Sequence, residues 1–280
     1  AVLAHSQRDL GSARSFIKNS ISIDPTFAAA HNTAGNISKD MGDINAALEH
    51  FSEALALNPK LAEAHANRSD VLRLLKRTDE AIKSARQAIA LDPILPEAYA
   101  NLGAAQIDVD DFEGALETLK KAITLAPDNP LNFVNLTKVQ ISLGLFESAL
   151  SSAENAIDKA PELPQAGNAL GNAYYALNQF KEAETAYKKA MRYSPCDPEL
   201  LGNLGNAIAR QHRLAEAEAL LRESLKISPG DPTILTNLGG VLLQAGNFES
   251  SQNSFDKALE LKPDLPDAHC IPYLRYRAIL

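Results

Sequence analysis

Hydrophobic residues recur along this chain at spacings of three and four, as at Leu116, Leu119 and Ile123. This spacing is typical of amphipathic helices. The apolar-periodic stretches come in pairs, and a short polar turn such as Met41-Gly42-Asp43 separates the two members of each pair. The pattern therefore predicts a chain of helix pairs without strands.

Prolines mark the ends of these pairs with a period of 34 residues. A proline in the first turn of a helix costs no hydrogen bond, and a proline after a helix cannot continue it. Two prolines three apart therefore indicate the end of one helix and the start of the next. The first series is Pro25, Pro59, Pro93, Pro127, Pro161, Pro195, Pro229 and Pro263, and the second is Pro96, Pro130, Pro164, Pro198, Pro232 and Pro266.

The proline period divides the chain into repeats. A partial repeat at 1–27 precedes the complete ones, and residues 266–280 are expected to start a further helix or to end irregularly, because Pro272 falls inside that last stretch. The complete repeats are 28–61, 62–95, 96–129, 130–163, 164–197, 198–231 and 232–265.

Small residues recur in the same register. Glycine in a helix interior costs about 1 kcal/mol relative to alanine, so its return needs a reason. We expect small residues of the two helices to face one another, which lets the helices approach closely. The glycines are Gly35, Gly103, Gly171, Gly205 and Gly239, and a small residue follows each of them twelve positions later, as at Ala47 and Ala115.

The period, the small residues and the closing proline closely resemble the tetratricopeptide repeat (TPR). The resemblance extends to about residue 270. It implies an all-α fold, a right-handed TPR superhelix (an α-solenoid) of antiparallel helix pairs, in which the first helix of each pair lines a concave groove. A long coiled coil is excluded, because two prolines interrupt every repeat.

The sixth residue of the repeat suggests where a ligand would bind. Asparagine is mildly unfavourable inside a helix, yet it occupies this position in five repeats: Asn67, Asn101, Asn135, Asn203 and Asn237. The asparagines either cap a helix–helix seam or form a ladder of amides that binds a peptide backbone. The ladder, with the sequence Asn-Leu-Gly, resembles the TPR arm of the O-linked N-acetylglucosamine transferases.

By the same resemblance, further residues would face the groove and give it specificity. They are Lys39, Arg73, Ile107, Ile141, Tyr175 and Leu243. For the apolar ones, a place in the partly buried core is an equally good interpretation. Co-chaperone TPR domains hold a C-terminal carboxylate with basic residues at the second, fifth and sixth repeat positions, and none of these positions is basic here.

Composition and charge restrict the classes of molecule that this chain is expected to bind. The chain of 280 residues carries a net charge of −8, which argues against nucleic acid as a binding partner. Its sequence has no apolar run long enough for membrane insertion. We expect protein or peptide partners. The two cysteines, Cys196 and Cys270, fit a reducing, cytoplasmic location weakly. Because the chain starts at Ala1, we expect it to be part of a longer protein.

Catalytic chemistry finds no support in the sequence. His31, His65 and His269 share a repeat position with Tyr99 and Phe133, so we expect them to pack like aromatic residues. The other histidines lack partners at metal-ligand spacing, and the Gly-rich stretches 167–173 and 201–207 lack the Gly-Lys-Ser/Thr of a phosphate loop. We therefore expect no catalytic residue, no metal site and no cofactor.

Two functions fit these observations. The first is a non-catalytic protein-interaction scaffold that binds an extended peptide or partner protein in its groove. The alternative is the substrate-recognition arm of a larger glycosyltransferase, similar to the O-linked N-acetylglucosamine transferases, or of another transferase whose catalytic domain lies outside this chain.

Overall fold

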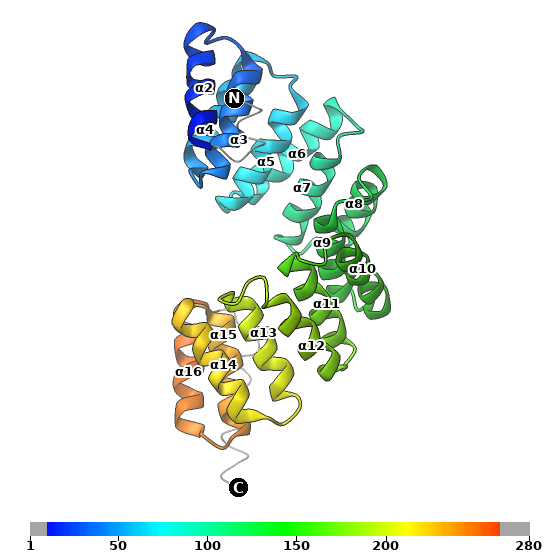
Figure 1. Cartoon of the computed structure of the whole chain (residues 1–280), viewed down its shortest axis with the longest axis vertical. Coiled ribbons are helices and arrows are strands. Elements are labelled where there is room, and N and C mark those ends of the chain that lie inside the picture. The colour runs from blue at the N-terminus through cyan, green and yellow to red at the C-terminus, as the bar shows by residue number, and fades with distance from the viewer. Residues whose placement is uncertain (1–9, 264–280) are drawn as a thin grey trace. The chain divides into compact units, whose positions relative to one another are not determined.

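The computed structural model describes residues 10–263, and this part of the chain is all-α (Figure 1). No strand occurs in it, so the predicted fold class is confirmed. The expected ending at 266–280 and His269 lie outside the described residues. The helices are α2 (Leu10–Ile23), α3 (Ala28–Asp40), α4 (Ile44–Leu57), α5 (Ala62–Leu74), α6 (Thr78–Leu91), α7 (Pro96–Ile107), α8 (Phe112–Leu125), α9 (Pro130–Ser142), α10 (Phe146–Lys159), α11 (Pro164–Ala176), α12 (Phe180–Ala190), α13 (Pro198–Ala209), α14 (Leu214–Ile227), α15 (Pro232–Gln244) and α16 (Phe248–Leu261).

The helices form two compact units, residues 1–143 and 144–280, which we call the N-terminal half and the C-terminal half. Consecutive helices pack on one another in each half. The odd-numbered helices, which begin the repeats and which we call first helices, also pack side by side: α3, α5, α7 and α9 in one half, and α11, α13 and α15 in the other. Contacts restricted to neighbouring repeats are typical of solenoid proteins.

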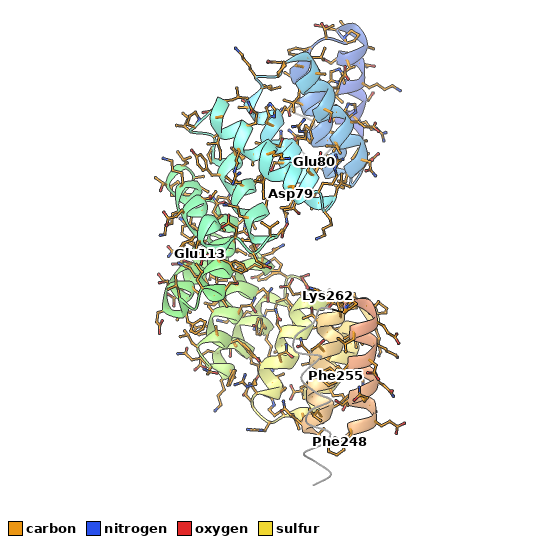
Figure 2. All side chains as sticks on the ribbon, turned by 180° about the vertical axis from the view of Figure 1, so that it is seen from behind. Asp79, Glu80, Glu113, Phe248, Phe255 and Lys262 are labelled. Carbon is orange, nitrogen blue, oxygen red and sulfur yellow. The ribbon has the colours of Figure 1, made fainter. Side chains whose placement is uncertain are left out.

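Helix ends follow the local sequence. Proline occupies the first turn of α7, α9, α11, α13 and α15. The Asp197 side chain accepts hydrogen bonds from the first backbone amides of α13, and Asp231 does the same at α15. The first turns of α6 and α8 contain acidic residues, among them Glu80 and Glu113 (Figure 2). Their negative charges interact favourably with the positive N-terminal end of the helix dipole.

The turn inside each repeat places one residue in the left-handed region of the backbone, and these residues recur every 34 positions. Gly42, Gly144 and Gly246 have φ values of 81°, 73° and 78°. In the other repeats a residue with a side chain takes the same conformation: Lys76, Asp110, Asn178 and His212. The predicted polar turn is therefore a short reversal that returns the second helix onto the first.

The repeated glycines lie beneath bulky side chains, a correction to the expectation that small residues face one another. A Cβ built on Gly35 would lie 2.4 Å from Phe51 Cε1, and one on Gly171 would lie 2.3 Å from Tyr187 Cε1. Each such partner follows its glycine by sixteen residues. The others are Leu119, Leu221 and Phe255, of which Phe255 is labelled in Figure 2. The small residue twelve positions on is close as well, since Ser69 Oγ donates to the Ala81 carbonyl oxygen at 2.8 Å.

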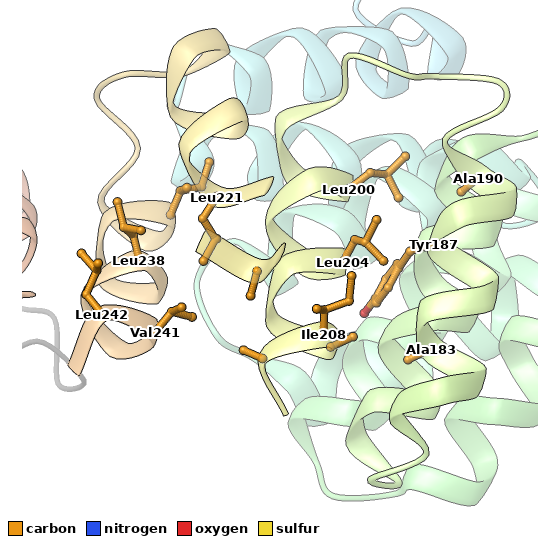
Figure 3. Close-up of a cluster of buried hydrophobic side chains, with 14 residues drawn as sticks. Ala183, Tyr187, Ala190, Leu200, Leu204, Ile208, Leu221, Leu238, Val241 and Leu242 are labelled. Atoms are coloured by element: carbon orange, nitrogen blue, oxygen red, sulfur yellow. The ribbon is translucent and has the colours of Figure 1, made fainter. Parts of the chain in front are cut away.

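The largest core cluster lies in the C-terminal half (Figure 3). Tyr187 of α12 faces Leu204 and Ile208 of α13, and the cluster continues through Leu221 to α15. The Tyr187 hydroxyl donates to Asn172 Oδ1 at 2.6 Å, and burial raises its pKa. These contacts fix the spacing of α11, α13 and α15, the three first helices of this half.

Candidate functional site

Every residue that the sequence singled out for peptide binding lies on a first helix. In the N-terminal half these residues are Lys39 on α3, Asn67 and Arg73 on α5, Asn101 and Ile107 on α7, and Asn135 and Ile141 on α9. In the C-terminal half they are Tyr175 on α11, Asn203 on α13, and Asn237 and Leu243 on α15.

In the N-terminal half, two of the asparagines link adjacent first helices. Asn67 Nδ2 donates to Asn32 Oδ1 at 3.0 Å, and Asn101 Nδ2 donates to the Ala66 carbonyl oxygen at 2.9 Å. The half-buried Asn135 has no side-chain hydrogen bond within the described residues. Each bond joins a first helix to the one before it, so these amides stabilise the row of first helices.

In the C-terminal half a short chain of amides does the same. Asn203 Nδ2 donates to Asn168 Oδ1 at 2.9 Å, and Asn168 Nδ2 donates to Glu199 Oε1 at 2.8 Å. Asn168 immediately precedes Ala169, which takes the place of asparagine at the sixth position of its repeat. The half-buried Asn237 makes no side-chain hydrogen bond in the described part of the chain.

The structural interpretation therefore holds for three of the five asparagines, but their bonding capacity is not exhausted. A side-chain amide offers two N–H donors and a carbonyl oxygen. No donor within residues 10–263 reaches Oδ1 of Asn67, Asn101 or Asn203. All three side chains are half-buried, so each oxygen stays available to a ligand on this face.

The two cations predicted in the N-terminal half are paired with carboxylates. Lys39 Nζ lies 3.0 Å from Asp70 Oδ2, and Arg73 Nη1 lies 3.3 Å from Asp108 Oδ2. Arg73 also lies 3.9 Å from Asp70. These ion pairs run across α3, α5 and the end of α7, and they offset the positive charges of Lys39 and Arg73.

The predicted apolar residues separate into buried and accessible ones. Ile107 is only 6% exposed and packs with Leu119 and Val139 in a core cluster, so it contributes mainly to the fold. Ile141 and Tyr175 are half-buried.

One cavity of about 250 Å³ brings several predicted residues together in the C-terminal half. Tyr175 of α11 and Asn237 and Leu243 of α15 line it. Residues that the sequence had not singled out complete its polar lining: Asn206, Arg210, Thr236 and Gln244. The first helices of three successive repeats thus meet at one hollow with amide, hydroxyl and guanidinium groups.

A second cavity of about 280 Å³ in the same half is mainly apolar. It lies where α12 ends at Ala190, and Gly167, Leu170 and Tyr193 contribute to its lining. Lys189 and Arg192 are its charged residues. It offers no set of convergent amides comparable to that of the first cavity.

The histidines at the aromatic repeat position serve the fold. His31 Nε2 lies 3.1 Å from the Pro25 carbonyl oxygen, and His65 Nε2 lies 2.9 Å from that of Pro59. The Tyr99 hydroxyl donates to the equivalent carbonyl at 3.0 Å. Among the described residues, no three His, Cys, Asp or Glu side chains gather as a set that could hold a metal ion.

Acidification is expected to weaken the N-terminal half through His65. Burial lowers its pKa from 6.5, and its buried Nδ1 has no hydrogen-bond partner in the described structure. The folded state therefore binds this proton less readily than the unfolded state. The free energy of unfolding should be constant above the unfolded pKa and should fall as the pH drops below it.

The variant His65→Tyr should reduce this pH dependence, because Tyr99 shows that a tyrosine keeps the bond to the proline carbonyl. His50, whose pKa is lowered by burial and by His31, stays in both proteins. Urea unfolding at about pH 7.5 and about pH 5.5 measures the difference. An equal loss of stability in both proteins would contradict the role given to His65.

No helix within residues 10–263 combines the length and apolar character that a bilayer crossing requires.

Comparisons with known proteins identify the repeat. A family model described as the cilia and flagella-associated protein 70 C-terminal domain matches residues 74–274, and one described as tetratricopeptide repeat matches residues 33–96. No curated protein sequence matches this chain.

Solved structures share the fold at low identity. The APC/C hetero-tetramer Cut9–Hcn1 superposes with a TM-score of 0.78 at 15% identity, over 93% of this chain and 51% of that one, so the present chain spans about half of it. A tetratricopeptide repeat protein from Parabacteroides merdae gives 0.68 at 15% identity, over 86% of this chain and 96% of that one. Pseudomonas aeruginosa PilF superposes with a TM-score of 0.61 at 19% identity, over 74% of this chain and 94% of that one.

None of the matches described here is a glycosyltransferase, so they lend the transferase-arm alternative no support. The fold is that of protein-interaction scaffolds in general. The chain belongs to the family of tetratricopeptide repeat proteins that the model of the cilia and flagella-associated protein 70 C-terminal domain describes.

Proposed function

We propose that this chain is a non-catalytic scaffold that binds an extended peptide, or an extended segment of a partner protein, on its first helices. The observation that carries this proposal is the cavity of the C-terminal half. Tyr175 and Asn237, two residues chosen from the sequence for peptide binding, line it together with Asn206 and Thr236. A solenoid can offer such a site repeatedly, because each repeat contributes the same positions.

Backbone pairing explains why amides would serve here. A peptide in extended conformation exposes N–H and C=O groups that a helix or sheet would otherwise satisfy. Asn237 has both its amide donors and its acceptor available, and Asn203 keeps its carbonyl oxygen. Each hydrogen bond would contribute about 0.5–1.5 kcal/mol net, so several weak contacts would add up to binding.

Selectivity would come from the residues beside the amides. In the C-terminal half Tyr175 offers an aromatic face and Leu243 an apolar one. In the N-terminal half Lys39 and Arg73 are paired with Asp70 and Asp108, so a ligand there would meet alternating charges. The amides of Asn67, Asn101 and Asn135 and the half-buried Ile141 complete the face of that half.

The variant with both Asn206→Ala and Asn237→Ala tests this proposal. A displayed library of random linear peptides, selected on the wild-type chain, supplies the probe. We expect the enriched peptide to bind the double variant about 10–100-fold more weakly, since about 1.4 kcal/mol corresponds to tenfold. Fluorescence titration of a labelled synthetic peptide gives the dissociation constants.

The matched control changes two exposed lysines on a second helix, Lys120→Ala and Lys121→Ala on α8. This variant should bind as the wild type does. Enrichment of no peptide, or equal affinities for all three proteins, would overturn the proposal.

A further inference from the structure

Arg210, the cation in the lining of the C-terminal half's cavity, has no carboxylate partner within residues 10–263. Arg210 directly follows α13, and its guanidinium carbon lies 4.6 Å from the centre of the Phe180 ring and 5.8 Å from that of Tyr175. The two rings meet edge to face at 5.4 Å. Contacts between a cation and aromatic faces hold a side chain in place without neutralising its charge.

The hydrogen-bonding capacity of Arg210 is mostly unused. Within residues 10–263 its side chain makes one hydrogen bond, a long one of 3.5 Å from Nη2 to Asn178 Oδ1, and no ion pair. A guanidinium carries five N–H donors in a planar fork that matches a carboxylate. An exposed fork with so many open donors, positioned by two rings, is suited to a ligand.

The neighbouring α12 carries two acidic residues, Glu182 and Glu184, and the less exposed of them, Glu184, already has hydrogen-bond partners. Glu184 accepts from Lys188 Nζ at 2.6 Å, from Gln211 Nε2 at 2.8 Å and from Arg213 Nη1 at 2.7 Å. Burial alone would raise the pKa of Glu184, but these three hydrogen bonds outweigh it and lower the pKa. Glu184 is thus committed to the link between α12 and the start of α14.

The other groups of the cavity suit the second oxygen of a carboxylate. Asn206 and Asn237 offer N–H donors, and the Thr236 hydroxyl already donates to the Pro232 carbonyl oxygen at 2.8 Å. Among the residues that the structure describes, no Asp or Glu contributes to the lining of the cavity. In this respect it differs from the N-terminal half, where both predicted cations have acidic partners.

From these contacts we infer that the peptide bound by the C-terminal half presents a carboxylate to Arg210, and that Asn206 and Asn237 donate to the same group. This inference rests on the function proposed above and specifies the chemistry of its ligand. Arg210 is the thirteenth residue of its repeat, whereas co-chaperone TPR domains hold a carboxylate with the second, fifth and sixth. The carboxylate comes from an acidic side chain or from the C-terminus of the peptide.

Two displayed libraries separate these sources. In one library the peptides are fused at their C-termini, so only side chains carry a carboxylate, and in the other the C-termini are free. If the carboxylate is a side chain, selection on the wild-type chain should enrich peptides of the first library that share an Asp or Glu at one position. If it is the C-terminus, selection should enrich peptides of the second library that share a C-terminal sequence. Either result supports the inference and names the source.

Titration of the selected peptide then tests the contact itself. Arg210→Gln should weaken binding about 10–100-fold, since hydrogen bonds to charged groups are the stronger ones. Converting the peptide carboxylate to an amide should weaken binding to the wild type by a similar factor but should change little for Arg210→Gln. Arg210→Lys keeps the charge but loses the planar fork of donors, so its affinity for the peptide should lie between those of the wild type and Arg210→Gln.

Arg222→Gln is the control, because Arg222 lies on α14 of the same repeat and pairs with Glu218 at 2.8 Å. It should leave binding unchanged. Peptides that share neither a fixed Asp or Glu in the first library nor a common C-terminal sequence in the second would overturn the inference while the proposed scaffold stands. An amide exchange that is equally costly for wild type and Arg210→Gln would do the same. Enrichment of no peptide from either library would overturn both.

Discussion

Gly239→Ala is expected to lower the free energy of unfolding by about 1–3 kcal/mol, although alanine is the better helix former. A Cβ at Gly239 would lie 2.6 Å from Cζ of Phe255 and 2.7 Å from its two Cε atoms. The Phe255 ring is 2% exposed, so it has no free space into which it could move. The cost of this overlap exceeds the gain in helix propensity, which is about 1 kcal/mol.

Gly240, the next residue of α15, is the matched control. Apart from its chain neighbours and the nearby backbone of α15, no atom of the described residues lies within 4 Å of a Cβ at this position, so Gly240→Ala should raise the free energy of unfolding by up to about 1 kcal/mol. Urea unfolding of both variants beside the wild type measures the contrast. A stabilising effect of similar size at both positions would contradict the close packing of Gly239 beneath Phe255.

Leu221→Ala is expected to lower the free energy of unfolding of the C-terminal half by about 2–5 kcal/mol. Leu221 is fully buried in the core cluster that joins α12, α13 and α15. Its Cγ lies 3.0 Å from a Cβ position on Gly205, and the glycine leaves no side chain that could refill the space. The truncation therefore leaves a cavity at the centre of the cluster.

Hydrogen exchange should show where this effect is felt. In a solenoid each repeat contacts its neighbours only, so amide protection should fall in α13–α15 and stay unchanged in α3–α6. Ile227→Ala, on the same helix at a position that is 45% exposed, should stay within about 0.5 kcal/mol of the wild type. A uniform loss of protection from α2 to α16 would contradict the repeat-by-repeat account of stability.

The repeat period made the helices predictable, because the residues that start and end them recur with it. Pro96 and Pro198 begin first helices, and the left-handed residue of the turn returns every 34 positions. The bulky partner of each repeated glycine could also have been read from the sequence. Ser69 lies where the glycine of other repeats lies, and sixteen residues later Ala85 replaces the bulky side chain.

The role of the asparagines could not be predicted, since one pattern serves two purposes. A row of amides with a 34-residue period is equally compatible with ligand binding and with bonds between adjacent helices. Asn32 and Asn168 decide part of the question, because they accept hydrogen bonds from Asn67 and Asn203. They lie one residue before Thr33 and Ala169, which occupy the sixth repeat position in the two repeats without an asparagine there.

The chemistry of the cavity depends on residues that do not repeat. Arg210 occupies a position where other repeats carry different residues, Asp108 among them, so a search for periodic residues passes over it. The acidic partners of Lys39 and Arg73 were missed for a related reason. Asp70 and Asp108 lie 31 and 35 positions after the cations they pair with, a spacing that has meaning only once the first helices are known to pack side by side.

A crystal structure of the wild-type chain with a library-selected peptide tests the central claim most directly. The account predicts an extended peptide on α11, α13 and α15, with its backbone hydrogen-bonded to the side chains of Asn206 and Asn237. A peptide bound to the second helices, or one bound as a helix with its backbone groups paired internally, would contradict it.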